Sequence, residues 1–108
     1  MTNEREVCYV AHAYEGNANN LAEAKRILRT LQIIDRESVY VSPLMAFSHI
    51  KYNEIGYDAE MALCLALLAR CDRLIVTGHH ISKGVKIEIQ YAQEHNIPIE
   101  YIGTIGEV

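Results

Sequence analysis

The sequence lacks an apolar run long enough to cross a membrane as a helix. Its longest such run, residues 61–69, falls well short of the roughly 20 residues that a spanning helix needs. It also lacks an N-terminal apolar stretch with a basic lead, the pattern of a secretory signal peptide. We therefore expect a cytoplasmic protein with no membrane partner.

Positive charge is also scarce. Lysine and arginine contribute 10 residues against 14 aspartates and glutamates, which gives a net charge of −4. A protein that binds nucleic acid regardless of sequence needs a basic face that displaces counterions. We therefore expect no nucleic-acid partner, whereas a small ligand, even an anionic one, needs only a few donors.

Clustered metal ligands are missing as well. The three cysteines, Cys8, Cys64 and Cys71, form no CxxC pair. His79 and His80 are neighbours but do not alone supply the tetrahedral set that zinc requires. We expect no metal, no cofactor and three buried free thiols, as is typical of a protein from a reducing compartment.

Apolar runs of strand length alternate with patterns of helical period, and no repeat or linker interrupts them. Strands separated by helices form parallel sheets with right-handed crossovers. We expect a single α/β domain over residues 1–108: a Rossmann-like or flavodoxin-like sheet of four or five parallel strands, the first strand central and helices on both faces. The expected strands are residues 7–11, 38–42, 72–77 and 99–102, and the expected helices are residues 21–31, 58–70 and 83–95.

Three features between these elements carry specific expectations. Asn19 or Asn20 is expected to cap the first helix, because an asparagine side chain accepts hydrogen bonds from the free N–H groups of a first turn. Pro43 is expected to end the second strand. Residues 44–57 show no clear period, so we expect a loop, and a loop this long in a small domain is often functional.

Open parallel sheets bind ligands beyond the carboxyl ends of their strands. Three segments fall there, residues 11–20, 43–56 and 78–84, and they are rich in polar, aromatic or glycine residues. This convergence predicts a pocket. The first segment has neither a GxGxxG nor a Walker pattern, so a plain strand–turn–helix link is its alternative interpretation.

Histidines and tyrosines in these segments suit a small ligand. Tyr14 and Tyr57 offer ring faces on which a base stacks, although both could instead cover the core. His12, His79 and His80 follow strands whose ends lie near each other. Acid–base work is one interpretation of these histidines, and ordinary loop residues are the other.

Residues 81–88 contain a helix start with a carboxylate one turn further on. Ser82 suits a cap, Gly84 leaves room for a ligand, and Glu88 shares the face of Gly84 at i+4. The alternative is a solvated Glu88 that pairs with Lys83 or Lys86. The expected buried stripe of this helix consists of Val85, Ile89 and Ala92.

Four short motifs resemble the nucleoside 2-deoxyribosyltransferase superfamily, which includes small deoxynucleoside-monophosphate N-hydrolases. They are residues 13–16 (Ala-Tyr-Glu-Gly), Asn20, residues 71–76 (Cys-Asp-Arg-Leu-Ile-Val) and residues 82–88 (Ser-Lys-Gly-Val-Lys-Ile-Glu). The chain is still more similar to short bacterial and phage Rossmann-like domains of unassigned function that are grouped near these enzymes. The resemblance spans nearly the whole chain.

The resemblance implies cleavage of an N-glycosidic bond, with Glu88 as the nucleophile that attacks the sugar C1′. Active hydrolases carry a second carboxylate where this chain has Cys64, and Glu60, one turn earlier, is the candidate substitute. The hydrolases also bind a 5′-phosphate through Ser and Arg, where this chain has Ala13 and Glu15. An acidic side chain there disfavours a monophosphate substrate.

Two functions follow from these residues. The first is an N-glycosidase or deoxyribosyltransferase-like enzyme with Glu88 and Glu60 as catalytic residues. The alternative is a module that binds a nucleotide-type ligand without catalysis, as a sensor or sequestering protein. The expected ligand-binding residues are Tyr9, His12, Tyr14, Gly16, Asn20, His79, Ser82 and Gly84.

The helix of residues 60–70 is apolar on all sides. A helix without a polar face must be covered on both sides, and the sheet covers only one of them. We therefore expect a homo-oligomer, a dimer or higher, that pairs through this helix. The alternative cover is the segment of residues 43–56.

Overall fold

The computed structural model describes residues 4–102 and shows an α/β domain built on a four-stranded parallel sheet. Its strand order, β2-β1-β3-β4, makes the first strand central and confirms the expected Rossmann-like or flavodoxin-like fold. The expected domain also includes residues 1–3 and 103–108, which lie outside the described part. In chain order the elements are β1 (Val7–Ala11), α1 (Ala18–Ile34), β2 (Val39–Val41), α2 (Pro43–Ala46), α3 (Tyr57–Leu68), β3 (Arg73–Val76), α4 (Lys83–Glu94) and β4 (Ile99–Tyr101).

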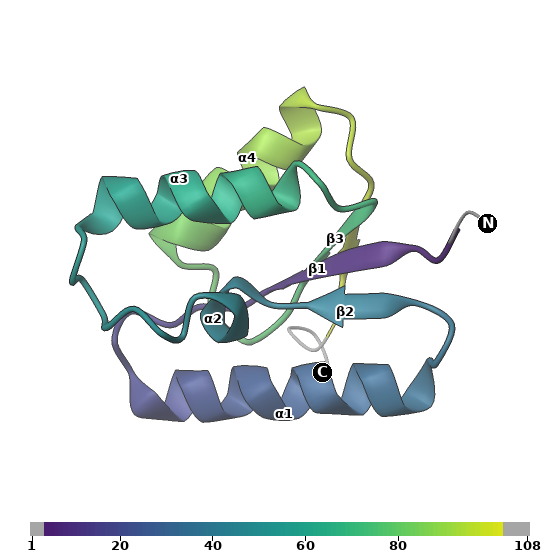
Figure 1. Cartoon of the computed structure of the whole chain (residues 1–108), viewed down its shortest axis with the longest axis horizontal. Helices are drawn as coiled ribbons and strands as arrows, with labels where there is room; N and C mark the ends of the chain where they lie inside the picture. The colour runs from purple at the N-terminus through teal and green to yellow at the C-terminus, as the bar shows by residue number, and fades with distance from the viewer. Residues whose placement is uncertain (1–3, 103–108) are drawn as a thin grey trace.

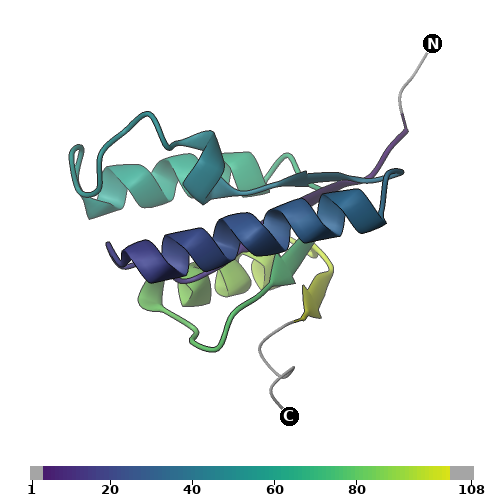
Figure 2. The same ribbon diagram turned by 90° about the horizontal axis from the view of Figure 1, so that it is seen from below.

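The helices cover both faces of the sheet, as expected. Figure 1 shows α1 along one face and α3 with α4 along the other. Figure 2, turned by 90°, shows α1 in front of the strands, with α3 and α4 lying beyond them. In this view the short α2 continues from the end of β2 toward α3. The layers therefore enclose β1 and β3 on both sides.

The main core lies between the central strands and the α3/α4 layer. Tyr9 and Leu74 are partners in the register of β1 and β3, and both are fully buried. Leu68 of α3 packs into the same cluster with no exposed surface. Burial of such a leucine contributes about 2 kcal/mol of hydrophobic stabilisation. Strands buried on both faces explain the nearly continuous apolar runs at residues 7–11 and 73–76.

The first helix begins earlier than expected. Its cap is Asn17, whose side chain accepts hydrogen bonds from the backbone N–H groups of Asn19 and Asn20. The expectation that Asn19 or Asn20 is the cap was wrong. The turn explains the difference, because the N–H of Asn17 donates to the carbonyl of Tyr14 and Glu15 adopts a positive φ of 53°. This turn places Asn17 at the cap position, and the helix begins at Ala18.

The segment after β2 is also more ordered than expected. Pro43 does end the strand, but it then occupies the first turn of α2. Ser42 caps this helix, because its side chain accepts a hydrogen bond from the N–H of Leu44. A proline in a first turn is well tolerated, since its missing N–H would have no helical partner. The expectation of an irregular segment from residue 44 onward was therefore wrong for the residues of α2.

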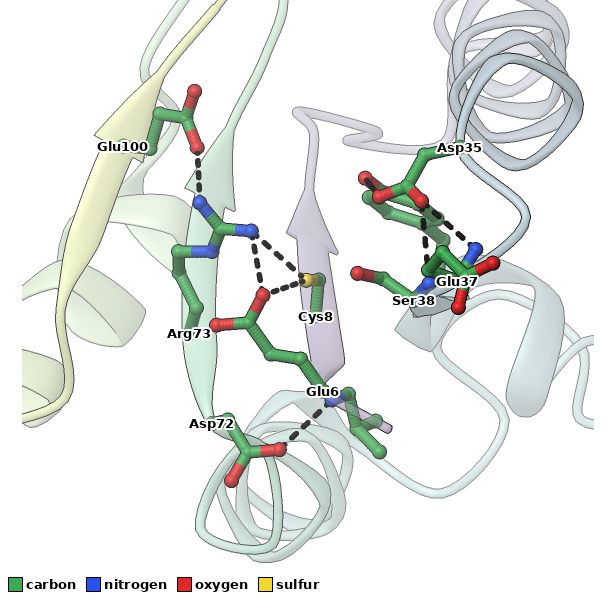
Figure 3. A network of polar contacts seen from close by, with 10 residues as sticks. Glu6, Cys8, Asp35, Glu37, Ser38, Asp72, Arg73 and Glu100 are labelled. Carbon is green, nitrogen blue, oxygen red and sulfur yellow. Dashed lines mark hydrogen bonds and ion pairs between the residues drawn. The ribbon is translucent and has the colours of Figure 1, made fainter. Parts of the chain in front are cut away.

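A polar network joins β1, β3 and β4 near the amino ends of β1 and β3. Figure 3 shows Arg73 of β3 between Glu6, Cys8 and Glu100. Its guanidinium lies 2.7 Å from Glu6 and 2.8 Å from Glu100, and its Nη2 is 3.6 Å from the sulfur of Cys8. Asp72 accepts a hydrogen bond from the N–H of Val7 at 2.8 Å. The network therefore ties the amino ends of β1 and β3 together and leaves their carboxyl ends free for a site.

The cysteines differ in their surroundings. Cys8 and Cys71 are buried, as expected, whereas Cys64 is only partly buried, and all three are free thiols. The expectation of three buried thiols was therefore wrong for Cys64. Within residues 4–102, no helix combines the length and the apolar character that crossing a membrane demands.

Candidate functional site

A cavity of about 250 Å³ lies beyond the carboxyl ends of β1 and β2, between the segments that follow them and helices α3 and α4. Its walls take residues from the β1–α1 segment, from α2 and the segment after it, from α3 and from the start of α4. The pocket predicted for this edge of the sheet is therefore present. The lining residues are His12, Tyr14, Glu15, Pro43, Leu44, Phe47, Ile50, Tyr52, Tyr57, Glu60, Met61, Leu63, Cys64, Ser82, Lys83, Gly84, Val85 and Glu88.

Glu88 is the buried carboxylate of this cavity. Its residue is only 5% exposed, and its side chain accepts a hydrogen bond from the hydroxyl of Tyr9. Burial raises the pKa of Glu88 from 4.5 to about 7, and the bond from Tyr9 opposes that rise. The alternative of a solvated Glu88 paired with Lys83 or Lys86 was wrong.

The buried face of α4 differs from the expected stripe. Its buried residues are Val85, Glu88 and Ala92, whereas Ile89 is only partly buried. The spacing of three and then four residues is that of one helical face. The helix therefore turns Glu88 inward, toward β1 and the cavity.

Tyr9 contacts the carboxylate of Glu88 from the side of the sheet. It lies in the central strand β1 with no exposed surface, and it does not line the cavity. Burial, followed by the charge of Glu88, raises its pKa well above the ordinary value, so the hydroxyl keeps its proton and donates a hydrogen bond to Glu88. Tyr9 was expected among the ligand-binding residues, but it lies behind Glu88 and outside the cavity lining.

Helix α3 adds Glu60 and Cys64, one turn apart, to the same cavity. Burial, followed by the charge of Glu88, raises the pKa of the Cys64 thiol to about 11. The thiol is therefore neutral at physiological pH. Glu60 and Glu88, the two expected catalytic carboxylates, line one cavity, with the neutral thiol of Cys64 also in its wall.

The start of α4 follows the expectation closely. Ser82 caps the helix, because its Oγ accepts a hydrogen bond from the N–H of Val85 at 3.3 Å. Gly84 faces α3: a Cβ at this position would make ordinary van der Waals contacts, 3.4 Å from the Met61 sulfur and 3.5 Å from the Tyr57 hydroxyl. Gly84 therefore lies at the junction of α3 and α4 as well as in the cavity wall.

The β1–α1 segment supplies one wall of the cavity. His12 is buried, with Nδ1 2.7 Å from the carbonyl of Ala13 and Nε2 3.5 Å from a carboxylate oxygen of Glu23. Tyr14 packs edge-on against Tyr52, with ring centroids 5.5 Å apart. The wall therefore combines a fixed imidazole with two phenol rings.

Besides Tyr9, three expected ligand-binding residues lie outside the cavity lining. Gly16 supports Tyr52, since a Cβ at this position would lie 3.0 Å from that ring. Asn20 donates a side-chain hydrogen bond to the carbonyl of Tyr14 at 3.2 Å. His79 has a mostly exposed side chain, and its Nε2 is 3.7 Å from Glu23. Gly16 and Asn20 thus shape the wall from behind, and His79 stays at the surface.

The sequence did not point to the apolar wall residue by residue. The segment after the second strand was singled out as a whole, by its length, its place and its composition, and its apolar members have no period that separates a pocket wall from ordinary core. The structure brings them together with residues of α2 and α3. The apolar wall consists of Pro43, Leu44, Phe47, Ile50, Met61 and Leu63.

Among residues 4–102, no group of three or more histidine, cysteine or acidic side chains is placed to hold a metal ion.

The fold and the site define a small parallel α/β protein with an apolar pocket that contains a buried carboxylate. The chain belongs to the family described as "Domain of unknown function (DUF7768)", whose model matches residues 6–102.

The structure is similar to a solved structure described as "Crystal structure of conserved protein from Enterococcus faecalis V583", with a TM-score of 0.73 and 18% sequence identity. The similarity covers 90% of this chain and 62% of that chain, so this chain spans about three fifths of the other protein's length. At this identity the likeness establishes the fold alone. No curated protein matches the sequence.

Proposed function

We propose that this protein cleaves the N-glycosidic bond of a nucleoside or a nucleotide-like compound, as the resemblance to the nucleoside 2-deoxyribosyltransferase superfamily implies. The observation that carries the proposal is the buried carboxylate of Glu88. It lies in an apolar cavity, on the first turns of a helix, and is held by the hydroxyl of Tyr9. A carboxylate at such a place suits the capture of a sugar cation.

The proposed reaction starts with attack of a Glu88 oxygen on the sugar C1′. The C1′–N bond breaks, its electron pair stays with the base, and a glycosyl ester forms on Glu88. Water, or the base of an acceptor, then attacks C1′ and releases the carboxylate. A pKa of about 7 for Glu88 leaves a substantial fraction of the nucleophile ionised at neutral pH.

The other lining residues have roles that fit this reaction. Glu60 is the carboxylate available to take the proton of the attacking water. The rings of Tyr14, Phe47 and Tyr57 offer faces for a flat base. The exclusion of water by the apolar wall strengthens the electrostatic effect of Glu88 on the reacting sugar.

A panel of nucleosides and nucleotides, with chromatography of the free base, tests the proposal. The wild-type protein is expected to release base from at least one compound. Glu88→Gln should lower that rate by orders of magnitude with little change in affinity, because the amide keeps the shape but cannot form the ester. A Glu88→Gln protein that turns over the substrate at the wild-type rate would contradict the assignment.

Ser82→Ala is the complementary variant. It removes the cap of α4 at the cavity edge and is expected to weaken binding while changing the rate at saturation little. Glu94→Gln, at the far end of α4, is the matched control and should leave both quantities unchanged.

The second candidate is a ligand-binding module without turnover. It is favoured by the neutral thiol of Cys64 in the cavity wall, because the related hydrolases carry a carboxylate at that position. In that case the panel yields binding without release of base. Glu88→Gln and Ser82→Ala would then both act on affinity alone.

A further inference from the structure

We propose that the pocket selects N-glycosides that carry no phosphate and whose base bears a positive charge. This inference rests on the proposed function, because it names the substrate class of the same site. It is carried by the charges, the helix caps and the rings that surround the cavity.

The charges of the lining residues favour a cation. Glu15, Glu60 and Glu88 supply three carboxylates, and Lys83 supplies the single ammonium group. Glu15 is exposed and holds His80, with the closest atoms 3.4 Å apart, whereas Glu88 is buried. A phosphate dianion in this cavity would meet more negative than positive charge, in a setting where apolar walls weaken solvent screening.

The usual anion sites are partly occupied by side chains of the protein. Helix N-termini bind phosphate through their free N–H groups. At α1 the side chain of Asn17 accepts hydrogen bonds from two of these groups, and at α2 and α4 the side chains of Ser42 and Ser82 each accept one. The N-terminus of α3 has no such side-chain cap, but its first turn carries Asp58 and Glu60, which repel an anion.

The aromatic residues point the same way. Ring faces attract cations, by about 0.5–1 kcal/mol at exposed sites and about 2 kcal/mol when desolvated. Lys83 already makes a cation–π contact of this kind, because its Nζ lies 5.1 Å from the centroid of the Tyr57 ring. Tyr14 and Phe47 add further rings to the cavity wall. A flat cationic base would therefore find both rings and carboxylates.

The way in which the base leaves the sugar is an independent reason to expect a cationic base. A neutral base usually needs a proton as it leaves. Beside Glu88, Cys64 holds its proton too tightly, with a pKa of about 11, and the hydroxyl of Tyr9 already donates to Glu88. The imidazole of His12 is turned toward other groups, with Nδ1 2.7 Å from the carbonyl of Ala13 and Nε2 3.5 Å from Glu23. A cationic base leaves as a neutral molecule when it keeps the electron pair of the C1′–N bond. No acid is then required, and Glu60 is free to take a proton from water.

The balance of this reaction is complete with water as the co-reactant. Attack by Glu88 forms the C1′–O bond, and the electron pair of the broken C1′–N bond cancels the positive charge of the base. Water then adds to C1′, Glu88 leaves as a carboxylate, and Glu60 passes the proton of that water to the solvent. The products are a neutral base, a free sugar and a proton.

The test compares two isomers of one nucleoside: 1-methyladenosine, which is a cation at neutral pH, and N6-methyladenosine, which is neutral. Adenosine and its 5′-monophosphate form a second pair, and ribo- and 2′-deoxyribonucleosides are both included. Affinity is measured by calorimetry on Glu88→Gln, which does not consume the ligand. Because this variant lacks the Glu88 charge, the expected preference is the part that Glu15 and Glu60 supply. Release of base is measured on the wild-type protein.

We expect the cationic isomer to bind at least tenfold more tightly than the neutral one, and the monophosphate at least tenfold more weakly than adenosine. A second substitution, Glu15→Gln, should reduce the preference for the cation about threefold, whereas Glu94→Gln should leave it unchanged. The preference should also fall as salt is raised.

The outcomes separate this inference from the proposed function. Equal binding of the two isomers, together with release of base by the wild-type protein, overturns the charge selection and leaves the glycosidase standing. Preferential binding of the cation without release of base from any compound overturns the glycosidase and supports the charge selection. If no compound binds, both are contradicted.

Discussion

The hydroxyl of Tyr9 in β1 donates a hydrogen bond to the carboxylate of Glu88 in α4, across 79 positions of the sequence. Both residues are buried, so this contact joins the central strand to the helix that carries the candidate nucleophile. Burial raises the pKa of Glu88 to about 7, and the bond limits the rise. The pair thus keeps a carboxylate that ionises near neutral pH inside an apolar pocket.

Removal of this hydroxyl is expected to shift the pH dependence of activity. In Tyr9→Phe the donor to Glu88 is lost, the pKa of Glu88 rises further, and the rising limb of the pH–rate profile moves to higher pH. The buried carboxylate also loses a partner, which costs about 1–3 kcal/mol of folding stability. The profile of base release and urea denaturation measure the two effects.

Tyr40→Phe is the matched control. Its hydroxyl also donates to a carboxylate, that of Asp35 at 2.8 Å, but neither residue lines the pocket. This variant should leave the pH profile where it is. An unchanged profile in Tyr9→Phe would show that the hydroxyl does not tune Glu88.

Glu88 is also expected to make stability depend on pH. Its pKa in the folded protein, about 7, lies above the ordinary value of 4.5, so the folded state holds the proton more tightly. The contribution of Glu88 to stability is then greatest at low pH and falls as the pH rises from about 4.5 through 7, by roughly 3 kcal/mol in all. Glu88→Gln lacks this loss and should exceed the wild type in stability at pH 8.

Urea denaturation at pH 5 and pH 8 measures this difference. Asp35 gives a contrast of opposite sign, because the hydrogen bond from Tyr40 lowers its pKa to about 2. Its contribution is present above the ordinary value of 3.8 and is lost as the pH falls through about 2. Asp35→Asn should therefore weaken the protein at both pH values. Parallel pH curves for wild type and Glu88→Gln would refute the buried, proton-retaining Glu88.

Gly16 is expected to control the position of Tyr52. It has a φ of +73°, and a Cβ there would lie 3.0 Å from the Tyr52 ring. Gly16→Ala should cost about 1–2 kcal/mol of stability through backbone strain, and it should weaken ligand binding because Tyr52 is pushed from the cavity wall.

A double-mutant cycle separates these two effects. In a Tyr52→Ala background the strain remains but the contact is gone, so Gly16→Ala should no longer change affinity. An equal loss of affinity in both backgrounds would show that the ring contact is irrelevant. Thermal denaturation and calorimetry provide the two readouts.

The strands could be predicted because the evidence for them is local, and their alternation with helices indicated a parallel sheet. Residues 7–11 form an apolar run, and the observed β1 has the expected bounds. The cap at Asn17 and the helix α2 were not predicted, because at each place several neighbouring residues could form the turn or the helix start. The pair Ser42–Pro43 did contain the signal, since a serine before a proline suits a helix start.

The site was predictable in part. The carboxyl ends of parallel strands meet at one edge, so the segments after the strands were expected to form a pocket, and Glu60 and Glu88 do line it. The burial of Glu88 was less accessible, because a glutamate next to lysines also fits a solvated helix. Its place three residues after Val85 and four before Ala92 was the signal that it shares their buried face.

The outer face of α3 is expected to pair two copies of the chain. Ala62 and Ala66 are exposed, although the helix is apolar on all sides. Ala62→Glu should shift a dimer toward monomer in sedimentation by placing charge in the interface. Thr30→Glu, at an exposed position of α1, is the control. A wild-type protein that sediments as a monomer at tens of micromolar would contradict this proposal.

The most direct test of the central claim is the mass of the protein after it reacts with a 2′-fluorinated nucleoside of a base that it releases, since the fluorine slows breakdown of the glycosyl ester. We predict that the chain gains the mass of one fluorinated sugar, that the peptide containing Glu88 carries it, and that Glu88→Gln gains nothing. Stoichiometric release of base without any gain of mass on Glu88 would contradict the role of Glu88 as the nucleophile.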